Sequence, residues 1–95
     1  MFSSLFGNKP THEGRKLVQE GAVLLDVRTP AEFNEGHVQG ALNIAVQELG
    51  ARMREIPKGA KVVVYCRSGG RSAMAAQMLR AQGHTVLDVG PMSAY

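Results

Sequence analysis

The chain has 95 residues, of which 44% are hydrophobic and 20% charged, and its net charge is +3. This composition predicts one folded domain and excludes a disordered chain. Lysine and arginine are spread along the sequence without a long basic run or interleaved aromatic residues, which excludes a typical nucleic-acid-binding surface and suits a small anionic substrate better.

The number of cysteines and the lengths of the apolar runs indicate in which compartment the protein is expected. The one cysteine, Cys66, cannot form an internal disulfide, so we expect a cytoplasmic protein. No apolar run reaches the roughly 18 residues of a membrane-spanning helix, and the first residues lack the pattern of a signal peptide. We therefore expect no stable membrane insertion, with residues 1–9 as an N-terminal tail and residues 10–95 as a single domain.

Short apolar runs alternate with helix-like segments along the chain. The runs are rich in valine or leucine, and they cover residues 22–27, 61–66 and 85–89. The helix-like segments cover residues 12–21, 46–56 and 71–83. This alternation predicts an α/β domain with a mainly parallel central sheet and helices on both faces.

The segment from residue 28 to residue 44 is less regular but contains a helix start. Thr29 can be the N-cap, with Pro30 at the first helical position and Glu32 at the third, which is the spacing of a capping box. Gly36 can end this helix, and residues 41–44 can then form a short further strand.

Polar residues stand at the carboxyl ends of the three predicted strands: Asp26, Cys66 and Asp88. Ligand sites of open α/β sheets form outside that edge. We therefore expect these three residues along one edge of the sheet, with Cys66 as the candidate for chemistry.

The sequence CRSGGRS, residues 66–72, surrounds this thiol with features that stabilise an anion. Residues 68–70 can turn tightly into the following helix and direct N–H groups inward. Arg67 and Arg71 add positive charge on either side. These features predict a depressed pKa and an ionised, exposed thiol, whereas a cysteine without such neighbours is more often inert packing.

The spacing of Cys66 and Arg71 bears on which anion the loop accommodates. Tyrosine-phosphatase-like loops need a cysteine, five residues and then an arginine to wrap a phosphate, and here only four residues intervene. The shorter loop favours a smaller charged group, such as a sulfur atom carried on Cys66.

Two long segments closely resemble the rhodanese family, the thiosulfate sulfurtransferases. CRSGGRS resembles that family's six-residue active-site loop, from Cys66 to Arg71, and LLDVRTPAEFNEGHVQGALNI, residues 24–44, resembles its upstream signature. With VGPMSAY, residues 89–95, the resemblance spans nearly the whole chain. It implies a small rhodanese-like fold with a sheet of four to five strands.

Two places depart from the family pattern. The family's first short strand would fall near residues 9–12, where KPTH is poor strand material. Near the end of the chain, Pro91 takes the place of a second glycine, and Tyr95 appears where the family has a tryptophan.

The resemblance implies a ping-pong sulfur transfer with no metal or organic cofactor. The catalytic Cys66 would take the outer sulfur of thiosulfate, or of a similar small anionic donor, and release sulfite. The resulting persulfide would pass its sulfur to cyanide or to a thiol, including a thiol on a protein. Arg67 is the better candidate for steering thiosulfate, and Arg71 either does the same or pairs with a carboxylate. The expected donor-binding residues are Arg67, Ser68, Gly69, Gly70, Arg71 and Ser72.

Asp26, Arg28 and Glu32 match the upstream signature and are expected to support the loop. They could tune its chemistry, or form a salt-bridge set that fixes the strand-to-helix turn, and we favour the second interpretation. His37 and Asn43 are expected to bind backbone groups in buried turns.

The remaining histidines and methionines are assigned no ligand. His12, His37 and His84 have no metal-ligand spacing to one another or to Cys66, so no metal site is expected. Met74 and Met78 are expected to pack in the core.

Three functions therefore stay open. The first is a sulfurtransferase enzyme. The second is a non-catalytic sulfur carrier or regulatory rhodanese module that acts with a partner protein. The third is a phosphatase or arsenate reductase on the same fold, which the short spacing from Cys66 to Arg71 disfavours.

Overall fold

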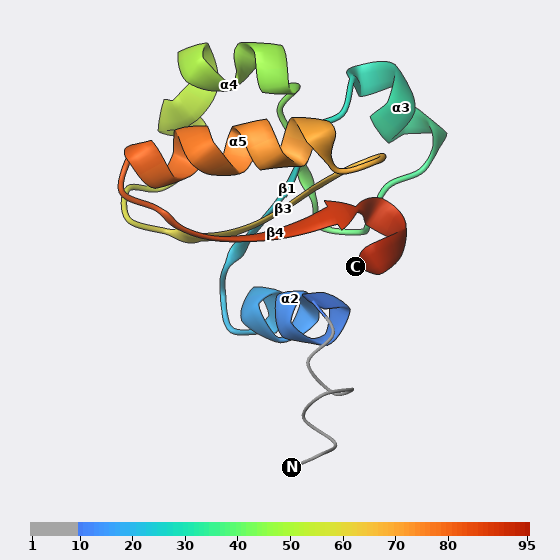
Figure 1. The fold of residues 1–95 in the computed structure, drawn as a ribbon, viewed down its shortest axis with the longest axis horizontal. Helices are drawn as coiled ribbons and strands as arrows, with labels where there is room; N and C mark the ends of the chain where they lie inside the picture. The colour runs from blue at the N-terminus through green and yellow to red at the C-terminus, as the bar shows by residue number, and fades with distance from the viewer. Residues whose placement is uncertain (1–9) are drawn as a thin grey trace.

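The computed structural model describes the backbone of residues 10–95 and the side chains from residue 13 onward. These residues form a parallel sheet with helices on both faces (Figure 1), as the sequence predicts. The four strands lie in the order β2-β1-β3-β4. They are β1 (Val23–Asp26), β2 (Leu42–Asn43), β3 (Lys61–Cys66) and β4 (Thr85–Pro91). The predicted tail of residues 1–9 lies outside the described residues.

Helices cover the sheet unevenly. In Figure 1, α4 and α5 lie on one face and α2 lies on the other, while α3 stands near the end of the sheet to which the arrow of β4 points. The helices are α2 (Pro10–Gln19), α3 (Pro30–Glu35), α4 (Val46–Arg52) and α5 (Gly70–Ala81), with the 3-10 turns η1 (Met53–Glu55) and η2 (Met92–Ala94). Residues 10–12 belong to α2, so the described part of the poor strand sequence KPTH is helical.

Within residues 10–95, no helix is long and apolar enough to cross a lipid bilayer.

Strand β3 divides the core into two layers because its side chains alternate between the faces of the sheet. Val62, Val64 and Cys66 belong to the cluster that packs against α4 and α5. Val63 and Tyr65 belong to the cluster on the α2 side. Four of the six β3 residues are completely enclosed, and Val62 is 1% exposed, which explains why this strand is a continuous apolar run.

The end of the chain completes the second cluster. Tyr95 is 6% exposed, and its ring centroid lies 6.5 Å from that of Tyr65. The guanidinium of Arg15, on α2, lies 4.6 Å from the Tyr95 centroid. Tyr95 is therefore a core residue, and it ties η2 to the sheet.

The predicted start of α3 is confirmed. The Thr29 hydroxyl accepts the Glu32 amide at 3.2 Å, and the Glu32 carboxylate accepts the Thr29 amide at 2.9 Å. Both bonds of a capping box are thus present, with Pro30 in the first turn and Gly36 at the C-cap.

Two predictions about helices are wrong in part. The segment 46–56 is not one helix, because α4 ends at Arg52 and continues as η1, which lets Ile56 turn inward to 3% exposure. Met74 is 57% exposed and is not a core residue, whereas Met78 packs against the core as expected. The buried stripe of α5 runs through Ser72, Ala75, Ala76 and Leu79, and Met74 lies off that stripe.

Candidate functional site

Cys66 stands where β3 meets α5. The strand ends at this residue, and the helix begins at Gly70. Between them, Gly69 adopts a φ of 109°, which a glycine accepts without a steric penalty. This turn brings the Gly69 amide to 3.0 Å from the Cys66 Sγ, to which it donates a hydrogen bond. The expected inward direction of the loop amides is therefore observed at Gly69.

The pKa of the Cys66 thiol lies below its ordinary value, the net result of opposing effects. Burial is the largest single effect and raises the pKa, because it removes the thiolate from water. Hydrogen bonds from the Ser72 hydroxyl and from the amides of Ser72, Gly69 and Ser68 lower it by more in total. The Ser72 hydroxyl also lies 3.1 Å from the Gly69 carbonyl, and its single proton can bond either acceptor. The donors around the sulfur therefore favour the thiolate.

The expectation of an exposed thiol is wrong. Cys66 has 0% exposure and belongs to the aliphatic cluster under α5. Arg67, Ser68 and Gly70 are exposed, so the loop surface rather than the sulfur faces solvent. The sequence signals predicted the donors correctly, but they do not determine how closely the loop covers the thiol.

Arg71 binds the carboxylate of Glu32. Its two terminal nitrogens lie 2.7 and 3.0 Å from the two carboxylate oxygens, which is a bidentate ion pair. The Arg71 hydrogen bond is the largest cause that lowers the Glu32 pKa, to about 2, and the Thr29 amide adds to it. Glu32 therefore joins the capping box of α3 to the loop after β3. Of the two roles considered for Arg71, pairing with a carboxylate is the one observed.

Asp26 and Arg28 form a separate buried ion pair at the end of β1. The Arg28 Nη2 lies 2.7 Å from the Asp26 carboxylate and 2.8 Å from the Gly36 carbonyl. The Arg28 backbone amide also donates to Asp26 at 2.8 Å. This pair fixes the strand-to-helix turn, as the structural interpretation proposed, but Glu32 takes no part in it.

The side chains of Asn43 and Asp88 likewise form hydrogen bonds with backbone groups. The Asn43 side-chain amide donates to the carbonyls of Asp26 and Arg28 at 3.0 Å each, as expected. Asp88 accepts the Gly90 amide at 2.9 Å, beside an irregularity in the pairing of β3 with β4. His37 also binds a backbone group as expected, since its Nδ1 lies 2.8 Å from the Phe33 carbonyl, but it is exposed and stacks on Phe33 rather than sitting in a buried turn.

A cavity of about 360 Å³ adjoins the loop. Its walls come from the α3 region, the Cys66 loop and η2. It is lined by Arg28, Glu32, Glu35, Gly36, Arg67, Met92 and Ser93. Arg67 is exposed and forms no ion pair with the side chains that the structure describes.

Sequence reasoning missed Glu35, Met92 and Ser93 as lining residues of this cavity. Glu35 lies only three residues after Glu32 on α3. The segment VGPMSAY, residues 89–95, contains η2, but no sequence pattern predicted that η2 would lie beside the Cys66 loop.

Comparisons with known proteins agree with this geometry. A sequence model described as "Rhodanese-like domain" matches residues 11–90. A protein of Allochromatium vinosum described as a sulfurtransferase is 46% identical over 65 residues, which cover 68% of this chain and 61% of that protein. The uncharacterized protein YqhL of Bacillus subtilis is 47% identical over 64 residues, 67% of this chain and 51% of that protein. The chain thus spans between half and two thirds of the length of these two curated relatives.

A solved structure extends the match over most of both chains. The human single-domain sulfurtransferase TSTD1 superposes with a TM-score of 0.70 at 32% sequence identity. The alignment covers 87% of this chain and 86% of the human one.

The first prediction concerns the φ of Gly69. Gly69→Ala should lower the free energy of unfolding by about 1–3 kcal/mol, because an L-residue is strained at a φ of 109°. Gly70→Ala is the matched control. Gly70 lies outside the positive-φ region, and nothing lies within 4 Å of an added Cβ. That variant should be neutral or up to about 1 kcal/mol more stable. Urea unfolding measures both, and equal stabilities for the two variants would contradict the prediction.

The second prediction concerns the charge of Glu32. Glu32→Gln keeps a capping oxygen for Thr29 but removes the anion that binds Arg71. At neutral pH it should cost about 1 kcal/mol, a value suited to a partly exposed pair. Because the folded-state pKa is lowered to about 2, this contribution is complete above the unfolded pKa and is lost as pH falls toward 2. The stability difference between wild type and variant should therefore shrink progressively below about pH 4.5. A difference that is constant from pH 7 to pH 3 in urea unfolding would contradict it.

Proposed function

Since the chain belongs to the rhodanese-like domain family, we propose that it is a sulfurtransferase that carries sulfur as a persulfide on Cys66. The observation that best supports the proposal is the hydrogen bond from the Gly69 amide to the Cys66 Sγ, at 3.0 Å. With the Ser72 hydroxyl and neighbouring amides, this donor lowers the thiol pKa in spite of burial. A thiolate is the nucleophilic form of cysteine.

The proposed reaction has two half-reactions. The Cys66 thiolate attacks the outer sulfur of thiosulfate, a new S–S bond forms, and the S–S bond of thiosulfate breaks with release of sulfite. Cyanide or a thiolate then attacks the outer sulfur of the persulfide, and the electron pair of the broken S–S bond returns to Cys66. The scheme uses no external oxidant, metal or organic cofactor, and the loop amides stabilise the anionic sulfur in both states.

The enclosed position of Cys66 adds a condition to this proposal. Because Cys66 has no exposed surface, the donor can reach the sulfur only when the loop is displaced. The exposed residues of the loop, Arg67, Ser68 and Gly70, are the ones that such a displacement would move.

We assign donor capture to Arg67 and loop support to Arg71. Arg67 lines the adjoining cavity and has no ion-pair partner among the described side chains. Arg71 is held by Glu32 at 2.7 Å, so its charge is already neutralised. This pairing also weakens the phosphatase alternative, because the arginine that would clamp a phosphate is engaged elsewhere. The remaining loop residues keep the role of shaping the anion site; they are Ser68, Gly69, Gly70 and Ser72.

A sulfur carrier that acts with a partner protein is the second candidate. The enclosed thiol favours it, since a partner that displaces the loop would be needed before sulfur could enter or leave. The two candidates differ in whether the isolated chain reacts with thiosulfate unaided.

The third prediction is therefore a mass measurement. After incubation of the full chain with thiosulfate, the intact mass should rise by one sulfur atom, and cyanide should remove the gain. Cys66→Ser, a substitution of similar size, should show no gain. A gain that persists in Cys66→Ser would refute the assignment of the persulfide. No gain in the wild-type chain would refute the unaided enzyme in favour of the carrier.

The fourth prediction tests Arg67. Arg67→Ala should lower the second-order rate constant for sulfur loading from thiosulfate by about threefold to tenfold, because an exposed cation that attracts the donor is lost. Lys61→Ala is the matched control, since it removes the same charge at the start of β3 and should leave the rate nearly unchanged. Stopped-flow loading at low salt measures both. Equal effects of the two substitutions would show that only net charge matters.

A further inference from the structure

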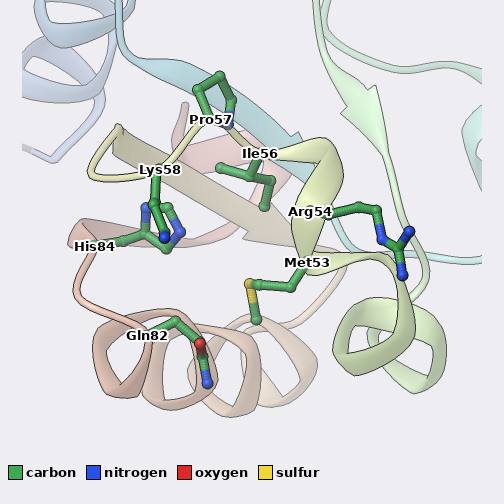
Figure 2. A pocket seen from close by; sticks show the side chains of 7 residues that line it. All are labelled: Met53, Arg54, Ile56, Pro57, Lys58, Gln82 and His84. Atoms are coloured by element: carbon green, nitrogen blue, oxygen red, sulfur yellow. The ribbon is translucent and has the colours of Figure 1, made fainter.

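A second cavity, of about 390 Å³, is shown in Figure 2, and no residue of the Cys66 loop lines it. It lies between η1 and the turn from α5 to β4, at the edge of the sheet where the strands begin rather than end. It is lined by Met53, Arg54, Ile56, Pro57, Lys58, Gln82 and His84. The volume is within the range of small-molecule sites, and none of these residues belongs to the proposed sulfur site.

His84 gives this cavity a buried polar group. The residue is only 7% exposed, and its Nδ1 lies 2.9 Å from the Ala60 carbonyl. A carbonyl only accepts, so Nδ1 must carry the proton, and Nε2 of the neutral ring is left with a lone pair.

The second ring nitrogen of His84 is not fully enclosed. Nε2 forms no hydrogen bond with the side chains described from residue 13 onward or with the described backbone. In the same part of the chain, every fully enclosed side-chain nitrogen or oxygen has a partner. Nε2 therefore keeps some accessible surface, and His84 is one of the residues that line the cavity.

The rest of the cavity is an apolar floor with a cation at its rim. Met53 and Ile56 direct their side chains toward its centre in Figure 2, and the Arg54 guanidinium points away. Lys58 is exposed and lines the cavity. The acidic residue in this segment, Glu55, is held by Arg52 at 2.7 Å. The Lys58 charge is thus not neutralised by that carboxylate.

We propose that this cavity binds a small hydroxylated organic acid with an apolar body. The carboxylate would pair with Lys58, a hydroxyl would donate to the His84 Nε2, and the body would cover Met53, Ile56 and Pro57. Each part of the ligand has a complementary group in the cavity. The carboxylate matches a cation, the hydroxyl matches a hydrogen-bond acceptor, and the body matches the apolar surface. The inference does not depend on the chemistry of Cys66.

The fifth prediction uses 4-hydroxyphenylacetate as the probe in a titration of the full chain followed by ¹H–¹⁵N correlation spectra. Saturable shifts should concentrate at residues 53–58 and 82–84. Binding should be substantial by roughly 20 mM, given the affinity that a ligand of this size ordinarily reaches. Phenylacetate, which lacks the hydroxyl, should bind about threefold to tenfold more weakly, and 4-hydroxyphenylacetamide, which lacks the charge, about fivefold more weakly.

Protein variants separate this site from a general attraction of anions. Lys58→Ala should weaken the acid about fivefold, whereas Lys61→Ala, three residues along and outside the cavity lining, should not. The hydroxyl contact is tested on the ligand, since replacing His84 would leave the Ala60 carbonyl without its donor. The proposal would be overturned if the acid and the amide bound equally well, or if the two lysine substitutions had equal effects. It would also be overturned if inorganic phosphate bound as tightly as the acid, or if the shifts were confined to the Cys66 loop.

Discussion

The hydrogen bond from the Gly69 amide to the Cys66 sulfur is the interaction on which the rest of the site depends. Cys66 is sealed from water, and a thiolate in that position is stable only where N–H or O–H donors replace its hydration. The donors come from the turn between the end of β3 at Cys66 and the start of α5 at Gly70, where Gly69 adopts a φ of 109°. Burial raises the thiol pKa and the donors lower it, and the net direction is downward because the donors prevail.

The shape of this loop is maintained from outside it. Arg71 and Glu32 are 39 residues apart in sequence and form two hydrogen bonds, at 2.7 and 3.0 Å. Glu32 also belongs to the capping box of α3, so one carboxylate fixes both a helix start and the loop. The two arginines of CRSGGRS consequently differ in their surroundings. Arg71 has its charge paired with Glu32, whereas Arg67 is exposed beside the cavity, which fits the proposed role of Arg67 in attracting an anion.

Local patterns predicted the alternation of strands and helices, the capping box at Thr29 and the glycine turn before α5, because backbone chemistry determines each of them. What the sequence did not show depends on how elements pack against one another. The thiol is enclosed rather than exposed, because closure of the loop is a tertiary property. Met74 is exposed because the buried side of α5 runs through Ala75 and Ala76 and does not include position 74. The tightening of α4 into η1, which shapes the second cavity, likewise depends on Ile56 reaching the core.

The enclosure of Cys66 has a consequence for any mechanism that extends this side chain by one sulfur atom. Cys66 has 0% exposure and lies in a packed hydrophobic cluster. We therefore expect an added sulfur atom either to displace the loop or to point toward the cavity beside Arg67 and Met92. In either case the loaded chain presents a different surface from the empty one around the same residues. An acceptor that contacts this surface would bind the two states with different affinities, and that difference would let it distinguish a loaded chain from an empty one.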